Sequence, residues 1–337
     1  MNNILVVNVN WLGDAIFSTP VFKALKKAYP NAHVSCLAVP RVKDVLNNCP
    51  FIDEVLVYDE KGKHFYPWAK LNMILELRGK KFDAAFMLHR SMTRALLVYL
   101  AGIPQRIGYG TKKQSHFLTQ TVVLESPDLH RSDEYLKVVE GFGVPVDDRA
   151  CELNVSAERS SAVEQKLAAS GIKSGDSLVV VNTGGNWDLK RWPAEYFSRL
   201  IARLVQETGV KILIPGAPSD KELVGRIARD SGVDPVVWAG ETSLEELFAL
   251  FKRADVVISN DSGPLHVAAA VGTDTIALFG PTRPEITGPR GRGRAVVLHK
   301  EIGCNKTPCY HLGCLQNECM RVITVDDVFK AYQKLRS

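Results

Sequence analysis

Apolar positions along this chain fall into two recurring kinds of block. Short continuous runs such as NILVVNV at 3–9 are rich in Val, Ile and Leu, as in strands that a sheet buries on both faces. Segments such as TPVFKALKKAYP at 19–30 place apolar residues three or four positions apart, which is the spacing of an amphipathic helix. Their alternation predicts an α/β protein with mostly parallel sheets covered by helices.

The first half of the chain repeats this alternation several times. Further strands are expected over 32–39, 54–59 and 82–88, with shorter ones in RIGY and TQTVVLE. Further helices are expected over 68–80, 91–102 and 133–143. Gly102 is placed to end the second of these helices, because glycine readily takes the left-handed conformation of a helix C-terminus.

The alternation then restarts in the second half. Strands are expected over 177–185, 210–216, 255–261 and 275–282. Ser243 and Glu246 have the spacing of a capping box, which predicts the start of a helix at 243–254.

Two consecutive α/β sets indicate two Rossmann-like domains. We expect an N-terminal domain at 1–155 and a C-terminal domain at 156–322, facing each other across a cleft. A last amphipathic helix at 323–337 could pack back on the N-terminal domain. A length of 337 residues agrees with two domains rather than one.

Composition narrows the class of protein. The chain is 46% hydrophobic and 23% charged, and no apolar run reaches the roughly 18 residues that span a membrane. Its first residues do not have the pattern of a secretory signal, so we expect a cytoplasmic protein with reduced thiols.

The net charge of the chain is +5. This charge would favour binding of an anionic small molecule or an anionic membrane surface, but a solvated surface of mixed charge explains it equally well. No nucleic-acid-binding motif, P-loop, G-x-S-x-G or H-E-x-x-H pattern occurs.

The segment SNDSGPLH, at 259–266, has the features of an anion site. A buried strand ends there, Asp261, Ser262 and Gly263 form a turn, and a helix begins near Pro264. The free N–H groups of such a helix start suit a diphosphate. A simple helix cap explains the same residues equally well, because Asp and Ser are favoured N-caps and Pro is favoured in the first turn.

Two neighbouring loops offer further candidate groups. NTGGNWDLKRWP places Lys190 and Arg191 after a glycine-rich strand end, where they could neutralise phosphate or form a solvated basic pair. PGAPSDKEL places Asp220 and Glu222 at a helix start, where a carboxylate could hold ribose hydroxyls or only interact with the helix dipole.

Two other features leave alternatives open. Asp14, in WLGDAIFSTP, follows the first strand and is either a helix cap, a catalytic carboxylate, or both. Four cysteines repeat at C-x4-C intervals: Cys304, Cys309, Cys314 and Cys319. They could bind zinc or an iron–sulfur cluster, but their even spacing is not that of a usual zinc site, and we favour reduced packing thiols, or pairs that oxidise in vitro.

Taken together, four segments resemble glycosyltransferase family 9, the ADP-heptose:lipopolysaccharide heptosyltransferases. They are VNVNWLGDAIFSTPVFKALKKAYPNAHVSCLAVP, LAGIPQRIGYG, NTGGNWDLKRWPAEYFSRLIARL and VISNDSGPLHVAAAVGTDTIALFGPT. The KRWP and CMRVIT segments resemble the second heptosyltransferase of that family more than the first. The resemblance implies the GT-B fold, with the acceptor on the N-terminal domain, the nucleotide-sugar on the C-terminal domain, and no cofactor.

The resemblance also implies roles for individual residues. Asp14 would be the general base that takes the proton of the acceptor hydroxyl. The donor would be held at its diphosphate, ribose and heptose by Thr183, Lys190, Glu222, Asp261, His266 and the amides of Ser262, Gly263 and Leu265. Basic residues of the N-terminal domain could face an acidic acceptor, or simply solubilise the surface: Arg41, Arg90 and Arg94.

The implied reaction is an inverting transfer of heptose from ADP-L-glycero-D-manno-heptose to the inner core of lipopolysaccharide. The enzyme would work at the cytoplasmic face of the inner membrane, held there by charge and exposed apolar side chains. Three alternatives remain at this point: the same scaffold acting on another nucleotide-sugar, a binder without catalysis, and an epimerase. The epimerase would need an acid–base pair at the donor, which the sequence does not reveal.

Overall fold

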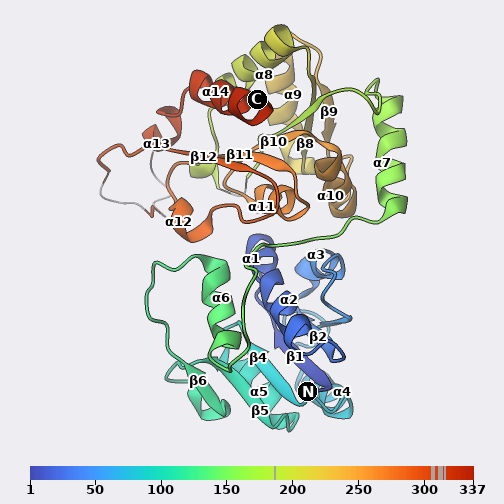
Figure 1. The fold of residues 1–337 in the computed structure, drawn as a ribbon, viewed down its shortest axis with the longest axis vertical. Coiled ribbons are helices and arrows are strands. Elements are labelled where there is room, and N and C mark those ends of the chain that lie inside the picture. The colour runs from blue at the N-terminus through green and yellow to red at the C-terminus, as the bar shows by residue number, and fades with distance from the viewer. Residues whose placement is uncertain (186, 305–307, 310–313, 315) are drawn as a thin grey trace. The chain divides into compact units, whose positions relative to one another are not determined.

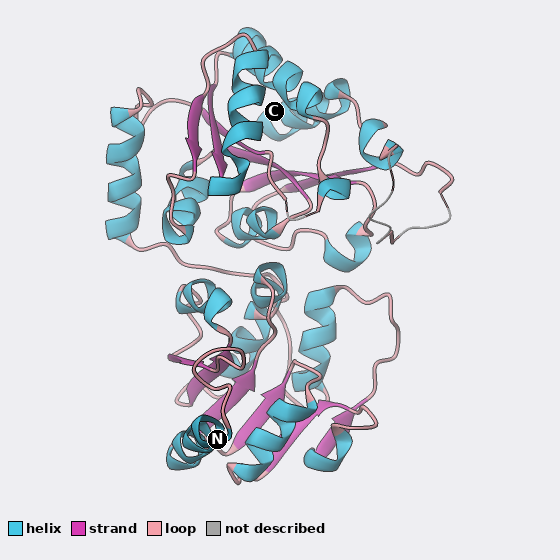
Figure 2. Cartoon of the chain, turned by 180° about the vertical axis from the view of Figure 1, so that it is seen from behind, coloured by secondary structure: helices cyan, strands magenta, loops and turns pink. Residues whose placement is uncertain are grey.

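The computed structural model describes all residues except 186, 305–307, 310–313 and 315. The chain forms two compact units, Met1–Asn154 and Val155–Ser337, which divide one residue before the expected boundary (Figure 1). Each unit contains a parallel sheet with helices on both faces (Figure 2), as the alternation of strand and helix patterns predicts.

The N-terminal unit is built on a sheet of strand order β3-β2-β1-β4-β5-β6, in which every pair is parallel. Its strands are β1 (Asn3–Val7), β2 (His33–Ala38), β3 (Glu54–Val57), β4 (Ala84–Met87), β5 (Gln105–Tyr109) and β6 (Gln120–Val122). Its main helices are α1 (Leu12–Phe17), α2 (Thr19–Ala28), α3 (Lys43–Asn47), α4 (Pro67–Gly79), α5 (Met92–Leu100) and α6 (Arg131–Glu140). This is the doubly wound order, in which the first strand lies at the point where the order reverses.

The C-terminal unit repeats the order as β12-β11-β10-β7-β8-β9. Its strands are β7 (Leu178–Asn182), β8 (Lys211–Gly216), β9 (Val236–Ala239), β10 (Val256–Asn260), β11 (Asp274–Phe279) and β12 (Ala295–His299). Its helices are α7 (Ala157–Ala169), α8 (Ala194–Thr208), α9 (Lys221–Asp230), α10 (Leu244–Arg253), α11 (Gly263–Ala270), α12 (Pro284–Thr287), α13 (Glu318–Arg321) and α14 (Val325–Arg336). All residues of β7 and β10 are buried, which matches their continuous apolar sequence.

Local signals set several helix ends as expected. Ser243 Oγ accepts the Glu246 amide at 3.1 Å, and Glu246 Oε2 accepts the Ser243 amide at 2.7 Å, so the capping box of α10 is confirmed. Gly102, just after α5, has a φ of 77°, as its place at a helix end predicts. Ser18 separates α1 from α2, and Pro20 in the first turn of α2 cannot extend the preceding helix.

The last helix, α14, belongs to the C-terminal unit. It packs on α8, β11 and β12, and its residues Val328, Phe329 and Leu335 lie in that unit's hydrophobic core. The expectation that it could pack back on the N-terminal domain stays a prediction, while the structure shows the helix in the core of the C-terminal unit. The physical reason is its apolar stripe, which covers one face of the C-terminal sheet.

Two further differences follow from weak patterns. The strand β12 was not predicted, because all its residues remain exposed or half-buried and its sequence AVVLH is short. The run TQTVVLE forms a strand over only three residues, in β6. Among the helices that the structure describes, none is both long and apolar enough to cross a membrane.

Candidate functional site

The carboxyl ends of β7 and β10 are neighbours, because these two strands pair in parallel. Asn260, the last residue of β10, ties the following loops together. Its Oδ1 accepts the Trp192 amide at 3.0 Å, and its Nδ2 donates to the carbonyls of Thr183 at 3.0 Å and Gly184 at 3.3 Å. A single buried amide side chain therefore fixes the glycine-rich loop beside the turn that begins α11.

Three side chains meet at this edge of the sheet. Lys190 Nζ lies 2.6 Å from Asp261 Oδ2, and the Thr282 hydroxyl donates to the same oxygen at 2.7 Å. The Asp261 side chain is 4% exposed and that of Lys190 is 22% exposed. Thr282 follows β11, which pairs with β10, so three adjacent loops contribute to this cluster. Lys190 and Asp261 therefore form an ion pair in which the lysine is partly accessible to solvent and the carboxylate is buried.

His266 lies against the same carboxylate. Its Nε2 is 3.8 Å from Asp261 Oδ1, and the residue is 5% exposed. Burial lowers the pKa of His266 to about 4; the charge of Asp261 opposes this shift and that of Lys190 adds to it. The imidazole is therefore neutral at pH 7 and contributes a hydrogen-bonding group rather than a positive charge.

The turn before α11 lacks the side-chain hydrogen bond of a simple cap. Ser262 is the N-cap residue, but its side chain makes no capping hydrogen bond and instead accepts from Asn182 Nδ2 at 3.3 Å. The amide of Leu265 donates to the Ser262 carbonyl at 3.1 Å, so this one of the three predicted phosphate-binding amides is already engaged. Among the described residues, no acceptor is found for the amides of Ser262 and Gly263, which are donors of the helix start.

The glycine-rich loop after β7 presents a hydroxyl. Thr183 is 1% exposed, and its Oγ1 has no hydrogen-bond partner among the described residues. Leaving such a group without a partner is costly, so it favours a ligand that supplies one. A Cβ at Gly184 would lie 2.8 Å from Asp220 Oδ2, which explains why glycine follows Thr183.

The loop after β8 carries the two predicted acidic residues. Asp220 is buried, and its Oδ2 accepts the Ala217 amide at 3.0 Å, while its Oδ1 lies 3.8 Å from Arg191. Glu222 is exposed in the first turn of α9. Asp220 therefore shapes its own loop, and Glu222 is the carboxylate available to a ligand.

In the N-terminal unit, Asp14 lies in the first turn of α1, directly after the carboxyl end of β1. Its Oδ1 is 3.9 Å from Arg131 Nε, and its carboxylate is hydrogen-bonded to the Tyr135 side chain. Burial, followed by the charge of Asp14, raises the pKa of Tyr135 well above its usual value. Tyr135 is therefore protonated at neutral pH and donates its hydroxyl to Asp14.

Arg131 completes this group on α6. Burial alone would lower its pKa, but Glu134, Tyr135 and Asp14 together hold the pKa above its usual value, so the guanidinium is charged. Glu134 pairs with both Arg131 and Arg90. Sequence reasoning did not identify Arg131 and Tyr135 as neighbours of Asp14. The pattern at 133–143 predicts only a helix, and the polar residues RSDE at its start were the one sequence signal that could have marked a site.

Two of the three arginines predicted to face an acceptor are accessible. Arg41 lies over the exposed ring of Trp11, with 4.8 Å between the guanidinium carbon and the ring centroid. Arg90 lies in the same way over Tyr109, at 4.6 Å, and pairs with Glu134. Both keep an exposed side chain at the carboxyl edge of the sheet.

Arg94 is different, because its side chain is only 2% exposed. It donates to the Asn8 carbonyl and to Asn10 Oδ1, both at 2.9 Å, and lies 3.1 Å from Glu60. Asn10 also contacts His89 Nε2 at 3.2 Å. The expectation that Arg94 faces an acceptor is therefore corrected: its charge is used inside the protein, where it fixes the loop that leads to Asp14.

The cysteine cluster gives no metal site among the described residues, where no group of three or more His, Cys, Asp or Glu side chains is arranged to hold an ion. Cys304 and Cys314 are exposed, and Cys309 and Cys319 are half-buried. Burial, and then the neighbouring Cys314, raises the pKa of Cys319, which favours the thiol. Most of the residues between these cysteines lie outside the described residues.

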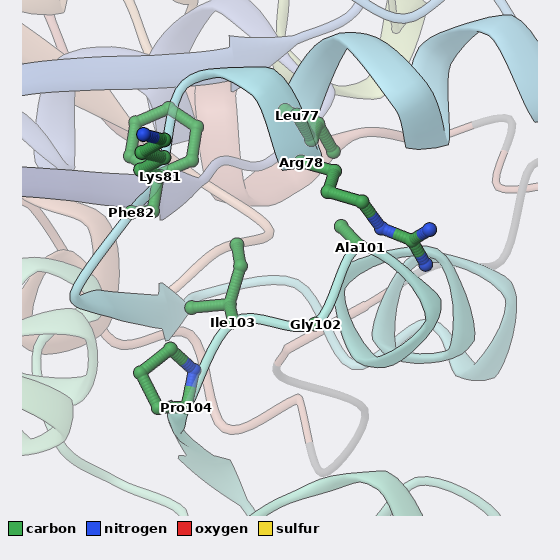
Figure 3. A pocket seen from close by; sticks show the side chains of 8 residues that line it. All are labelled: Leu77, Arg78, Lys81, Phe82, Ala101, Gly102, Ile103 and Pro104. Carbon is green, nitrogen blue, oxygen red and sulfur yellow. The ribbon is translucent and has the colours of Figure 1, made fainter.

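A separate depression of about 290 Å³ lies between the C-terminal ends of α4 and α5 (Figure 3). Leu77 and Phe82 line it, and Arg78 at its side donates to the Leu100 carbonyl at 2.7 Å. It lies at the amino ends of β4 and β5, whereas Asp14 follows the carboxyl end of β1. We therefore do not include it in the candidate site.

Comparisons with known proteins identify the family of the chain. The family described as Glycosyltransferase family 9 (heptosyltransferase) matches residues 71–318. Lipopolysaccharide heptosyltransferase 2 of Salmonella typhimurium is 27% identical over 335 residues, covering 95% of this chain and 96% of that protein. A glycosyl transferase of family 9 from Veillonella parvula superposes with a TM-score of 0.90 at 28% identity, over 99% of this chain and 97% of that one. The ADP-heptose lipopolysaccharide heptosyltransferase II of E. coli shares the fold, with a TM-score of 0.80 at 24% identity over 99% and 98% of the two chains.

Proposed function

The chain belongs to glycosyltransferase family 9, the heptosyltransferases, and we propose that it transfers heptose from ADP-L-glycero-D-manno-heptose to the inner core of lipopolysaccharide. Its fold is GT-B, with one Rossmann-like sheet in each unit. The observation that carries the proposal is the Lys190–Asp261–Thr282 cluster beside the open amides of Ser262 and Gly263. Lipopolysaccharide heptosyltransferase 2 from Salmonella typhimurium, similar along nearly the whole chain, supports the choice of substrates.

The C-terminal unit supplies the donor-binding groups in this proposal. Lys190 and the amides at the start of α11 stabilise the negative charge that develops on the diphosphate as it leaves. The buried Thr183 hydroxyl gains a phosphate oxygen as its missing partner. Asp261 accepts hydrogen bonds from heptose hydroxyls, the neutral His266 lies beside it, and the exposed Glu222 binds the ribose. These fixed positive groups do the work that a divalent ion does in other phosphate chemistry, so no cofactor is assigned.

The N-terminal unit supplies the base and the acceptor surface. The acceptor hydroxyl attacks the anomeric carbon from the face opposite ADP, the bond to the diphosphate breaks, and Asp14 takes the proton. The product therefore has an inverted anomeric configuration. Asp14 must lie within about 3 Å of the attacking oxygen, and Tyr135 and Arg131 hold its carboxylate in one orientation. Arg41 and Arg90 face the acidic, phosphorylated acceptor at the cytoplasmic side of the inner membrane.

The transfer assay offers ADP-heptose and other sugar nucleotides together with a heptose-deficient lipopolysaccharide, and follows ADP release and acceptor mass. The proposal predicts release of ADP and gain of one heptose per acceptor in equal amounts. Transfer of another sugar would show a different donor, and ADP release without a heavier acceptor would show hydrolysis. No reaction with any donor would indicate a binding protein instead, and a changed free nucleotide-sugar would indicate an epimerase.

A further inference from the structure

The outer side of α4 and the loop before it carry an unusual set of exposed apolar side chains. We call this surface the aromatic face and define it by five residues that are each more than half exposed: Phe65, Tyr66, Trp68, Leu71 and Leu75. Large apolar patches on a protein surface mark contacts with another protein or with a membrane.

The aromatic face is continuous. The rings of Tyr66 and Trp68 stack with centroids 4.5 Å apart, and Phe65 meets Tyr66 edge-on at 5.3 Å. Trp68, Leu71 and Leu75 then follow one another at helical spacings of three and four residues, which aligns them along one side of α4.

The opposite side of α4 is also apolar, because Met73 and Leu77 are buried in the core of the N-terminal unit. A helix that packs on a core with one side normally presents polar residues on the other. Here the packing of the unit explains the inner side only.

The charges around the aromatic face are mostly positive. Segment 59–81 contains three acidic residues, Asp59, Glu60 and Glu76, and six basic ones: Lys61, Lys63, Lys70, Arg78, Lys80 and Lys81. Lys80 pairs with Glu54, whereas Lys61, Lys63 and Lys81 are exposed. Aromatic rings interleaved with lysines suit the boundary between lipid headgroups and acyl chains, where rings are buried and amines meet phosphates.

A second copy of this chain is a poorer partner for the same surface. In a symmetric dimer the patch would meet itself, which would bring two surfaces of net positive charge together. An anionic surface removes that repulsion and uses the charge.

We propose that the aromatic face docks the N-terminal unit on an anionic lipid bilayer. This deepens the proposed function, on which it rests, because a glycolipid acceptor lies in such a bilayer. The loop that carries Phe65 follows the carboxyl end of β3, the edge of the sheet at which Asp14 follows β1. Glu60 in that loop contacts Arg94, which holds Asn8 and Asn10. Docking therefore holds the edge of the sheet that carries the candidate base near the lipid surface.

The test measures flotation of the full-length protein with vesicles, without donor or acceptor. Vesicles of phosphatidylethanolamine and phosphatidylglycerol are compared with vesicles of phosphatidylcholine. The variants are Phe65→Ser with Trp68→Ser, and Lys61→Glu with Lys63→Glu. The matched control is Val123→Ser, which removes a valine that is 78% exposed outside the aromatic face. Trp68→Tyr tests for rescue by another interfacial ring, and the melting temperature checks that each variant folds.

We expect the protein to bind the anionic vesicles only, and each double variant to bind them at least about tenfold more weakly. For the two lysines this follows because one basic residue at the surface contributes about a fivefold gain in binding. The control and Trp68→Tyr should bind like the original protein. Unchanged vesicle binding in both folded double variants would overturn the proposal. It would also be overturned if Phe65→Ser with Trp68→Ser kept vesicle binding but lost self-association in analytical ultracentrifugation, because the aromatic face would then be a contact between copies of the chain. ADP release with a detergent-solubilised acceptor, which needs no bilayer, tests the proposed function separately.

Discussion

At the scale of single residues, Lys190 has two partners in this account: Asp261 in the free protein and the diphosphate in the complex. Its ion pair with Asp261, at 2.6 Å, is only partly exposed, so its position is fixed before a donor arrives. A cation held in advance costs little entropy when the ligand binds.

We predict that Lys190→Ala weakens ADP binding by about ten- to one-hundredfold, the range for a lost hydrogen bond to a charged group. Isothermal titration calorimetry with ADP measures this. Arg253→Ala, which removes a cation from the same unit outside the site, is the control. Unchanged affinity in Lys190→Ala would remove this residue from the donor site.

Tyr135 is a positioning residue, since it acts through Asp14. We predict that Tyr135→Phe lowers kcat by about tenfold, because the carboxylate loses the donor that fixes its orientation. ADP affinity should not change, because the donor groups belong to the C-terminal unit. Steady-state kinetics together with calorimetry separate the two effects. A weaker affinity for ADP, or a lower melting temperature that accompanies the loss of activity, would indicate a general structural role.

His266 makes stability depend on pH. Its pKa is near 4 in the folded protein and about 6.5 when unfolded, so the unfolded chain binds more protons between these values. Stability is therefore full above pH 6.5 and falls as pH drops toward 4, by about 3 kcal/mol from this residue. Denaturant unfolding at pH 7 and pH 4.5 should show a smaller loss in His266→Gln than in the original protein. Equal losses would contradict the assignment.

Sequence reasoning located the residues that follow adjacent strands. Lys190 and Asp261 are 71 positions apart, but both follow strand ends that a parallel sheet brings together. It did not locate Tyr135 and Arg131, because their contact with Asp14 depends on how α6 packs against α1. The burial of Arg94 was equally unpredictable, since an arginine in a helix is normally exposed.

At the scale of elements, Asn260 joins two loops without reaching a ligand itself in this account. Its three hydrogen bonds fix the glycine-rich loop after β7 and the segment that carries Lys190. The prediction for this element is that Asn260→Ala weakens ADP binding by about tenfold and that hydrogen exchange rises at 183–192. Asn182→Ala, which removes a neighbouring amide that contacts Ser259 and Ser262, is the comparison for the other loop. Unchanged exchange at 183–192 would show that Asn260 does not hold this loop.

The pattern of apolar residues predicted most elements because buried parallel strands and amphipathic helices each have a clear period. The pattern did not predict β12, whose residues are incompletely buried. It also did not predict the surface on which α14 packs. The pattern shows that α14 has an apolar stripe, but not which sheet the stripe covers.

At the scale of the whole molecule, each unit has its own sheet and its own buried core. In the proposed mechanism the N-terminal unit binds the acceptor and takes its proton, and the C-terminal unit binds the donor. Binding and catalysis should therefore separate when one residue of the N-terminal unit is changed.

The most direct test of this division is the turnover of Asp14→Asn at saturating ADP-heptose with a heptose-deficient acceptor, measured beside its affinity for ADP. The substitution keeps the size of the side chain and removes the base. We predict that ADP affinity stays within about twofold while kcat falls by about one-hundredfold or more. A variant that keeps near-normal kcat would contradict the role of Asp14 and, with it, the assignment of the base to the N-terminal unit.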